Sequence, residues 1–191
     1  TEVTFSSSTI SFGDHTFGGI RSLKFLGKLK TIPKNLFKSC TSLNELIIES
    51  PITTIEAFAF DLCTSLTKIE IPSTLKIIQR GAFNECTSLK QIVIPSQVVK
   101  IEDLAFSKCK SLMKITLPAS LTSIGYSVFN EVRSLEILGD LKVITKQMFS
   151  GCKLLERIIL PSSITEIQDN AFYACTSLLE ITIPDLVTSI V

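Results

Sequence analysis

The chain has 191 residues, of which 45% are hydrophobic, and its 19 Lys and Arg against 18 Asp and Glu give a formal net charge of +1. Nucleic-acid binding and polybasic membrane attachment both need a concentrated basic surface, so this balanced composition argues against both functions. No run reaches the roughly 18 apolar residues of a membrane span, and the start has neither a basic n-region nor an apolar h-region, so neither a span nor a signal peptide is predicted.

One sequence motif recurs along the chain at intervals of 20 or 23 residues, and it is clearest between Cys86 and Phe106. Its phenylalanine recurs at Phe17, Phe37, Phe60, Phe83, Phe106, Phe129, Phe149 and Phe172. Its leucine recurs at Leu23, Leu43, Leu66, Leu89, Leu112, Leu135, Leu155 and Leu178. A period of about 20 to 29 residues with Leu-x-x-Ile-x-Ile at its centre is typical of a leucine-rich repeat solenoid, in which each repeat is one coil.

We expect residues 1–191 to form a single leucine-rich repeat domain, because each coil of a solenoid packs mainly on its neighbours. About eight coils are expected, at 12–31, 32–54, 55–77, 78–100, 101–123, 124–143, 144–166 and 167–189. Residues 1–11 are interpreted as the remnant of a preceding coil or a loose cap, and a ninth coil opens at Ile190. Since neither end supplies the polar outer face of a terminal coil, we expect a longer native protein or end-to-end self-association through the terminal coils.

Each coil is expected to contain a strand, a proline turn and then a more compact segment. Ile92 and Ile94 alternate as in a strand with one face inward, and Pro95 ends that strand because proline cannot donate to a ladder. The apolar positions from Ile101 to Phe106 and beyond are spaced by three to four, which indicates a helical turn or two. The predicted fold class is therefore an α/β repeat, with right-handed coils, a parallel β-sheet on the concave face, and short helical turns or irregular segments on the convex side.

Two of the expected coils, 12–31 and 124–143, are three residues shorter than the others. When they are aligned on the leucine, they lack the second buried strand residue and the proline, and they carry Gly27 and Gly139 at that place. Glycine permits a backbone angle that is closed to other residues, so the chain is expected to turn early there. We interpret the short coils as local tightening of the solenoid, with a ligand loop as the alternative.

The Cys-Thr-Ser-Leu, Ile-Pro-Ser and Ala-Phe elements, repeated every 23 residues over nearly the whole chain, resemble the BspA-type leucine-rich repeats. That family includes surface proteins of bacteria and large families in parasitic protists. The resemblance implies a non-enzymatic binding module, often for host or matrix adhesion, although protist members also occur inside the cell or at its membrane. The family motif is structural, so it implies no catalytic residues and no cofactor.

The cysteines occupy one position of the repeat, and Ile20 and Val132 replace them in the two short coils. Because this position accepts valine, we expect a ladder of buried free thiols that behave as small hydrophobic side chains. The alternative is three disulfides between adjacent coils, since equivalent residues there lie within bridging distance. The six cysteines, with the three pairs given in order, are Cys40 and Cys63, Cys86 and Cys109, and Cys152 and Cys175.

The sequence shows no set of residues with the spacing of a catalytic or metal-binding site. His15 is the sole histidine and has no neighbouring Ser or Cys to form a nucleophile and base pair, so a surface turn is expected there. We predict neither enzymatic activity nor a metal site. Several carboxylates follow the isoleucine position, where negative charge would favour the start of a helical turn. They are Glu56, Glu102, Asp103, Glu166 and Asp169.

The open face of the predicted sheet is the candidate binding surface, because solenoids use this face to bind partners. Residues two and four positions after each repeat leucine should point to solvent. The candidate site consists of Glu45, Ile47, Lys68, Glu70, Gln91, Val93, Lys114, Thr116, Arg157 and Ile159. The same rule places Phe25 and Ile137 on this face. β-branched residues favour strands whatever they face, so the convex side and the loops are the alternative sites.

Two functions are consistent with the sequence. The first is a protein-interaction solenoid that acts as a scaffold through its concave sheet. The second is a cell-surface adhesin fragment that binds host or extracellular-matrix protein, as the resemblance implies. The expected free thiols and the absence of an Asn-x-Ser/Thr sequon favour a cytoplasmic or membrane-associated location, whereas the resemblance favours the cell surface.

Overall fold

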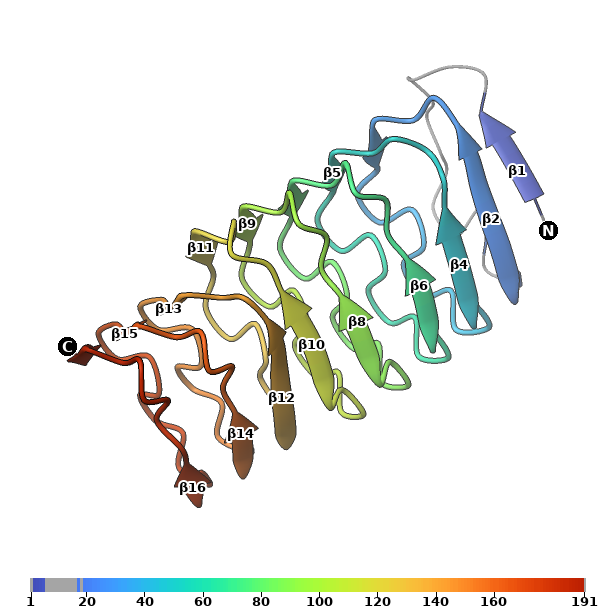
Figure 1. Ribbon diagram of the computed structural model, residues 1–191. Helices are drawn as coiled ribbons and strands as arrows, with labels where there is room; N and C mark the ends of the chain where they lie inside the picture. The colour runs from blue at the N-terminus through green and yellow to red at the C-terminus, as the bar shows by residue number, and fades with distance from the viewer. Residues whose placement is uncertain (1, 6–16, 18, 191) are drawn as a thin grey trace.

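The computed structural model describes residues 2–5, 17 and 19–190, and in them the chain winds as a solenoid of stacked coils (Figure 1). Most coils contribute one longer strand and one two-residue strand, on different sides of the array. The strands of the first side, here called the front sheet, are three to six residues long except for the last, which has two. They are β1 (Glu2–Phe5), β2 (Ser22–Gly27), β4 (Glu45–Ile48), β6 (Lys68–Glu70), β8 (Gln91–Val93), β10 (Lys114–Leu117), β12 (Ser134–Gly139), β14 (Arg157–Ile159) and β16 (Glu180–Ile181).

The two-residue strands form a second ladder, here called the rear ladder. They are β3 (Thr31–Ile32), β5 (Thr54–Ile55), β7 (Ile77–Ile78), β9 (Lys100–Ile101), β11 (Ser123–Ile124), β13 (Val143–Ile144), β15 (Glu166–Ile167) and β17 (Ser189–Ile190). All of the pairings between these strands are parallel and join adjacent coils. The predicted solenoid with a parallel sheet is thus confirmed, and the rear ladder is an element that the sequence analysis did not predict.

The compact segment around each phenylalanine, here called the phenylalanine turn, is irregular. The prediction of helical turns here was wrong, since the described part of the chain contains no helix. In these residues there is accordingly no helix long and apolar enough to cross a membrane. The backbone N–H groups of Phe58, Phe60 and Leu62 donate to carbonyl groups of the next coil, at distances of 2.8 to 2.9 Å. These donors are therefore used between coils and are not available for the i−4 bonds of a helix.

In the phenylalanine turns from Phe37 to Phe172, two positions adopt the left-handed backbone conformation. They lie two residues before and two residues after the phenylalanine, as at Leu104 and Lys108 on either side of Phe106, with φ of 59° and 58°. In the turns from Phe37 to Phe172, glycine occupies these positions only at Gly81 and Gly151. The full set is Asn35, Ser39, Phe58, Leu62, Gly81, Glu85, Leu104, Lys108, Ser127, Glu131, Gln147, Gly151, Asn170 and Ala174.

The core is a continuous stack that runs along the axis of the array. Phe37, Phe60, Phe83 and Phe106 are fully buried, and successive rings stack with centroids 5.0 to 5.2 Å apart and interplanar angles of 3° to 9°. The next step, to Phe129, is wider at 6.2 Å. Inward isoleucines and leucines of the front sheet and rear ladder pack around this stack.

The first short coil keeps both buried strand residues, which corrects the expected loss of one of them. Leu23 lies opposite Leu46, and Leu46 comes three residues after Leu43, the repeat leucine of its own coil. The segment that the short coil lacks is therefore equivalent to residues 41–43, the Thr-Ser-Leu turn before the strand. Gly27 and Gly139 do adopt positive φ, 108° and 99°, as the glycine argument predicts.

The second short coil shifts the register of the front sheet. β12 places Ile137 opposite Ile115 in one neighbouring coil and Leu135 opposite Ile158 in the other. Ile115 and Ile158 occupy the same position of their repeats, so the two registers differ by two residues across β12. An offset of two keeps the same residues facing inward, and both Leu135 and Ile137 are buried.

Candidate functional site

The outer face of the front sheet carries the predicted site residues. Burial alternates along each strand, as at β8, where Gln91 and Val93 are exposed and Ile92 between them is buried. All ten candidate residues lie on this outer face and are exposed or half-buried. Phe25 and Ile137, which the same rule placed there, are instead fully buried, because the rule counted from leucines that are out of register in the short coils.

Charged side chains on this face pair across neighbouring strands. Lys68 Nζ lies 2.8 Å from a carboxylate oxygen of Glu45 on β4 and 2.8 Å from one of Glu70 on its own strand. Hydrogen bonds to these two carboxylates raise the pKa of Lys68, so it is a cation at all physiological pH values. Further along the sheet, Lys114 Nζ lies 2.9 Å from Glu136 Oε2. The charges are therefore arranged as local pairs of opposite sign.

Apolar side chains interrupt these charges over the second half of the front sheet. Val93 lies opposite Thr116, and Thr116 lies opposite Leu138, so the three side chains form one row across β8, β10 and β12. Val93 is 66% exposed, and Ile159 on β14, the strand that follows this row, is 46% exposed. Leu138 was not predicted as a site residue, because its place in the row depends on the shifted register of β12. A surface of this kind, with apolar groups flanked by charges, is typical of protein–protein interfaces of moderate apolar content.

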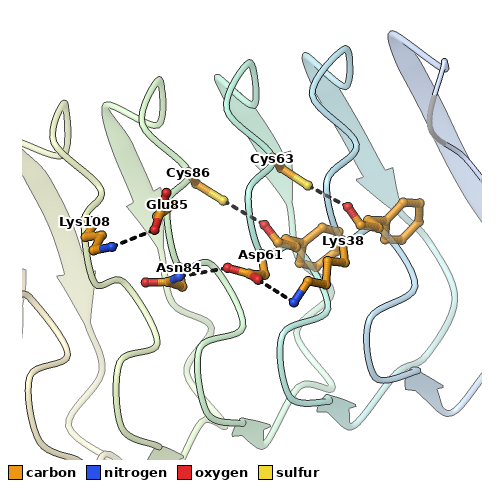
Figure 2. Close-up of polar contacts among 9 residues, drawn as sticks. Lys38, Asp61, Cys63, Asn84, Glu85, Cys86 and Lys108 are labelled. Carbon is orange, nitrogen blue, oxygen red and sulfur yellow. Dashed lines mark hydrogen bonds and ion pairs between the residues drawn. The ribbon is translucent and has the colours of Figure 1, made fainter. Parts of the chain in front are cut away.

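The phenylalanine turns carry a separate polar network, which Figure 2 shows. Asp61 is buried, and its carboxylate accepts a hydrogen bond from Asn84 Nδ2 at 2.8 Å and pairs with Lys38 Nζ at 3.0 Å. Lys108 and Glu85 pair in the same way at 2.7 Å. Each of these contacts joins two adjacent coils, so the network stabilises the stacking of coils and leaves few polar groups free for a ligand.

The cysteines form the expected ladder and are free thiols in this structure, with five buried and Cys175 half-buried. Their thiol groups donate to phenylalanine carbonyls of the preceding coil, as from Cys63 to Phe37 at 3.0 Å and from Cys86 to Phe60 at 3.2 Å (Figure 2). Burial raises the pKa of Cys40 to about 11 and that of Cys109 to about 12. Thiols that resist ionisation in this way are poor nucleophiles and poor metal ligands.

The carboxylates after the isoleucine position have a different role from the expected one. Without a helix they cannot complement a helix terminus; instead, three of the five accept backbone N–H groups of adjacent coils and the other two contact side chains. Glu56 accepts the N–H of Lys34 at 3.0 Å, and Asp103 accepts the N–H of Tyr126 at 2.9 Å. Glu102 accepts the N–H of Arg80, Glu166 accepts a hydrogen bond from Gln168, and Asp169 pairs with Lys146.

His15 lies outside the described residues. Within the described part of the chain, no group of three or more His, Cys, Asp or Glu side chains is placed to hold a metal ion.

Comparison with known proteins matches residues 1–111 and 76–191 to the protein-family model described as BspA type leucine rich repeat region, in six copies. Among solved structures, the crystal structure of a leucine-rich repeat protein of T. pallidum is 29% identical, with a TM-score of 0.69 over 85% of this chain and 80% of that one. The crystal structure of the pneumococcal vaccine antigen PcpA is 23% identical, with a TM-score of 0.55 over 98% of this chain and 63% of that one, which shows a shared fold. No curated protein sequence matches.

Proposed function

The chain belongs to the BspA-type leucine-rich repeat family, and on this premise we propose that it is a non-enzymatic protein-interaction module that binds its partner through the outer face of the front sheet. The observation that carries the proposal is the row of Val93, Thr116 and Leu138, together with Ile159 on β14, which lies opposite Glu136. Val93, Leu138 and Ile159 are exposed between paired charges. A surface of this kind buries apolar area on binding, while its charges select the partner and fix its orientation.

The absence of enzymatic activity is part of the proposal and has its own support. The cysteine thiols are held protonated by burial, which makes them poor nucleophiles. Several carboxylates of the described coils are engaged with backbone N–H groups or lysines, as at Glu56 and Glu85. A rigid array of such pairs suits recognition, because little side-chain freedom is lost when a partner binds.

The proposal is tested by a pull-down with this chain as bait, against cell lysate and against purified extracellular-matrix proteins. Reversing four front charges, with Glu45→Lys, Lys68→Glu, Lys114→Glu and Arg157→Glu, should reduce capture of a genuine partner at least tenfold. A matched control reverses exposed charges away from the front sheet, with Lys76→Glu and Arg80→Glu, and should retain capture. Binding that survives the front reversal but not the control would move the site off the front sheet.

The second candidate function is a cell-surface adhesin fragment for host or matrix protein, which the family's association with bacterial surface proteins supports. The same experiment separates the two functions. Capture from lysate that depends on the front charges supports an intracellular scaffold. Capture of matrix protein alone supports the adhesin.

A further inference from the structure

The front sheet is not continuous. β6 is the last strand of one sheet, which runs β1-β2-β4-β6, and β8 is the first strand of another, which runs β8-β10-β12-β14-β16. The two strands are neighbours in the array, as Figure 1 shows, and the coils that carry them are consecutive. We call the gap between residues 67–71 and 90–94 the seam.

The backbone hydrogen bonds that join other coils are missing at the seam. The N–H of Thr67 donates to the Asn44 carbonyl at 2.9 Å, and the N–H of Met113 donates to the Lys90 carbonyl at 2.9 Å. The equivalent bond from the N–H of Lys90 to the Thr67 carbonyl does not occur in the structure, although both residues are described. The facing edges of β6 and β8 therefore hold backbone donors and acceptors that no strand satisfies.

The side chains at the seam are correspondingly uncovered. Ile69 and Ile71 occupy inward positions of the repeat but are only half-buried, whereas the equivalent Leu46 and Ile48 of the preceding coil are 0% and 3% exposed. A groove of about 430 Å³ lies between the two strands and is lined by residues of both. The seam therefore combines an open edge with core side chains that are only half-buried.

The opposite side of the same two coils is closed. The rings of Phe60 and Phe83 stack at 5.0 Å and 9°, and the N–H of Phe60 donates to the Ala82 carbonyl at 2.8 Å. The coils are therefore held together at their phenylalanine turns and separated only at the front. Cα atoms of β6 and β8 lie within 8 Å of each other, so a strand that pairs with both edges can enter only if the front widens about this closed side.

We propose that the seam binds an extended peptide segment of a partner protein, which adds as a parallel strand along the unpaired edges of β6 and β8. An extended backbone is the ligand that supplies donors and acceptors at the spacing of a strand edge. Its alternate side chains would cover Ile69 and Ile71, so they should be apolar. The proposal rests on the proposed function, since it names the kind of partner that the front sheet accepts.

Charge defines the outward side chains of the peptide. The outward residues Lys68 and Glu70 of β6, with Glu45 beside them, sum to a charge of −1, and the outward residues Gln91 and Val93 of β8 are uncharged. The other charge of the seam, Lys90, lies just before β8. A lysine or arginine at an outward position of the peptide complements this balance. The chain's own segment 112–118, Leu-Met-Lys-Ile-Thr-Leu-Pro, has this pattern and contains β10, which pairs with the edge of β8 away from the seam, so it serves as a probe.

Binding of a fluorescent, end-capped 112–118 peptide is measured by anisotropy. An otherwise identical peptide that is N-methylated at alternate backbone nitrogens should bind at least tenfold more weakly, because it cannot pair along a strand edge. A staple across the seam, Glu70→Cys with Val93→Cys, should reduce binding at least tenfold when oxidised and restore it when reduced. The control staple, Val93→Cys with Thr116→Cys, joins strands that are already paired and should leave binding within twofold.

Hydrogen exchange adds a readout that needs no ligand. The amide of Lys90 should exchange at least tenfold faster than those of Thr67 and Met113, and the peptide should slow it. The proposal is overturned if the N-methylated peptide binds equally well, if the seam staple has no effect, or if Lys90 is as protected as its counterparts. If the peptide fails while the front charge reversals still abolish partner capture, the seam proposal alone is wrong; if the reversals have no effect, the front sheet is not the binding face.

Discussion

At the scale of the residue, the left-handed positions of the phenylalanine turns are the least expected feature. They are occupied almost entirely by residues other than glycine, although such residues are strained there by roughly 1 kcal/mol or more. The strain is tolerated because each turn is held by backbone hydrogen bonds to the next coil. Small side chains at these positions allow the strain to be measured with little loss of other contacts.

We expect Ala174→Gly and Ser127→Gly each to raise the free energy of unfolding by about 1 kcal/mol, since glycine adopts positive φ without a steric penalty. Gly151→Ala should lower it by a similar amount, because φ is 76° there and only Ser127 Oγ lies within 4.0 Å of the added Cβ. Urea unfolding measures all three variants. Destabilisation by the two glycine substitutions would contradict the strain argument.

A second residue-scale prediction concerns close packing of backbone at Gly125. A Cβ there would lie 2.3 Å from the Asp103 backbone nitrogen, which cannot move without breaking the stacking of the two coils. We expect Gly125→Ala to lower the free energy of unfolding by at least about 2 kcal/mol. Gly19→Ala, where nothing lies within 4 Å of the added Cβ, is the control and should change it by less than about 0.5 kcal/mol.

At the scale of the element, the phenylalanine stack and the front sheet differ in their contribution to stability. Phe106 is fully buried, so Phe106→Ala should lower the free energy of unfolding by about 3 to 5 kcal/mol. Lys114 is exposed on the front sheet and paired only with Glu136, so Lys114→Ala should change it by less than about 0.5 kcal/mol. Urea unfolding distinguishes them, and a larger effect at Lys114 would mean that the faces are wrongly assigned.

The cysteine ladder predicts a dependence of stability on pH. In the unfolded chain a thiol ionises near pH 8.5, whereas burial raises the pKa of Cys109 to about 12 in the folded protein. The stability from this protonated thiol is therefore complete below about pH 8.5 and is lost as the pH rises toward 12. For Cys109 alone, the loss at pH 10 should be about 2 kcal/mol.

Cys109→Val is the matched variant, because valine occupies the same position at Val132. Between pH 7.5 and pH 10, the free energy of unfolding of the variant should fall by about 2 kcal/mol less than that of the parent, as measured by urea unfolding. Equal losses in the two proteins would show that Cys109 ionises as easily in the folded state as in the unfolded one.

The sequence specified those elements that depend on side-chain periodicity, and it did not specify those that depend on backbone geometry. The phenylalanine and cysteine positions predicted the core stack and the thiol ladder, because buried columns need the same residue in every coil. The left-handed turns were not predicted, since residues as different as Leu104 and Lys108 adopt them. The register of β12 was missed because an offset of two residues leaves the hydrophobic alternation unchanged.

The missing pairing at the seam could not be predicted from the sequence either. The segment that contains β6 reads Lys-Ile-Glu-Ile-Pro over 68–72, and the segment that contains β8 reads Gln-Ile-Val-Ile-Pro over 91–95, so both have the pattern of a fully paired strand. Whether two such strands pair depends on their separation in space, which side-chain periodicity does not encode. All ten predicted site residues do lie on one face, because strand alternation alone decides this.

At the scale of the whole molecule, the two breaks in the array fall at different places. The front sheet is broken between β6 and β8, and the rear ladder is broken between β11 and β13. Each pair of adjacent coils at a break is still joined by the other ladder, as β7 with β9 at the seam and β10 with β12 at the short coil. The array should therefore unfold as one cooperative unit, although each coil contacts only its neighbours.

The phenylalanine at the seam should be decisive for this cooperativity. Phe83 stacks on Phe60 across the seam, where the front bonds are absent, so Phe83→Ala should separate unfolding into two transitions, with residues 19–77 distinct from 78–190. Phe106→Ala removes a ring between coils whose front strands are paired and should leave one transition. Residue-level hydrogen exchange in moderate urea measures both, and one transition in both variants would show that the rear ladder alone couples the halves.

The bonding of each coil to the next also determines how the molecule would respond to mechanical force. The hydrogen bonds of the phenylalanine turns run between adjacent coils. Tension on the two ends of the chain would therefore break these bonds one coil at a time. Each coil of 23 residues that detaches would release about 75 to 80 Å of chain, and each short coil of 20 residues about 65 to 70 Å. A stretched chain of this kind would lengthen in regular steps, and the smallest force would be needed where β6 meets β8.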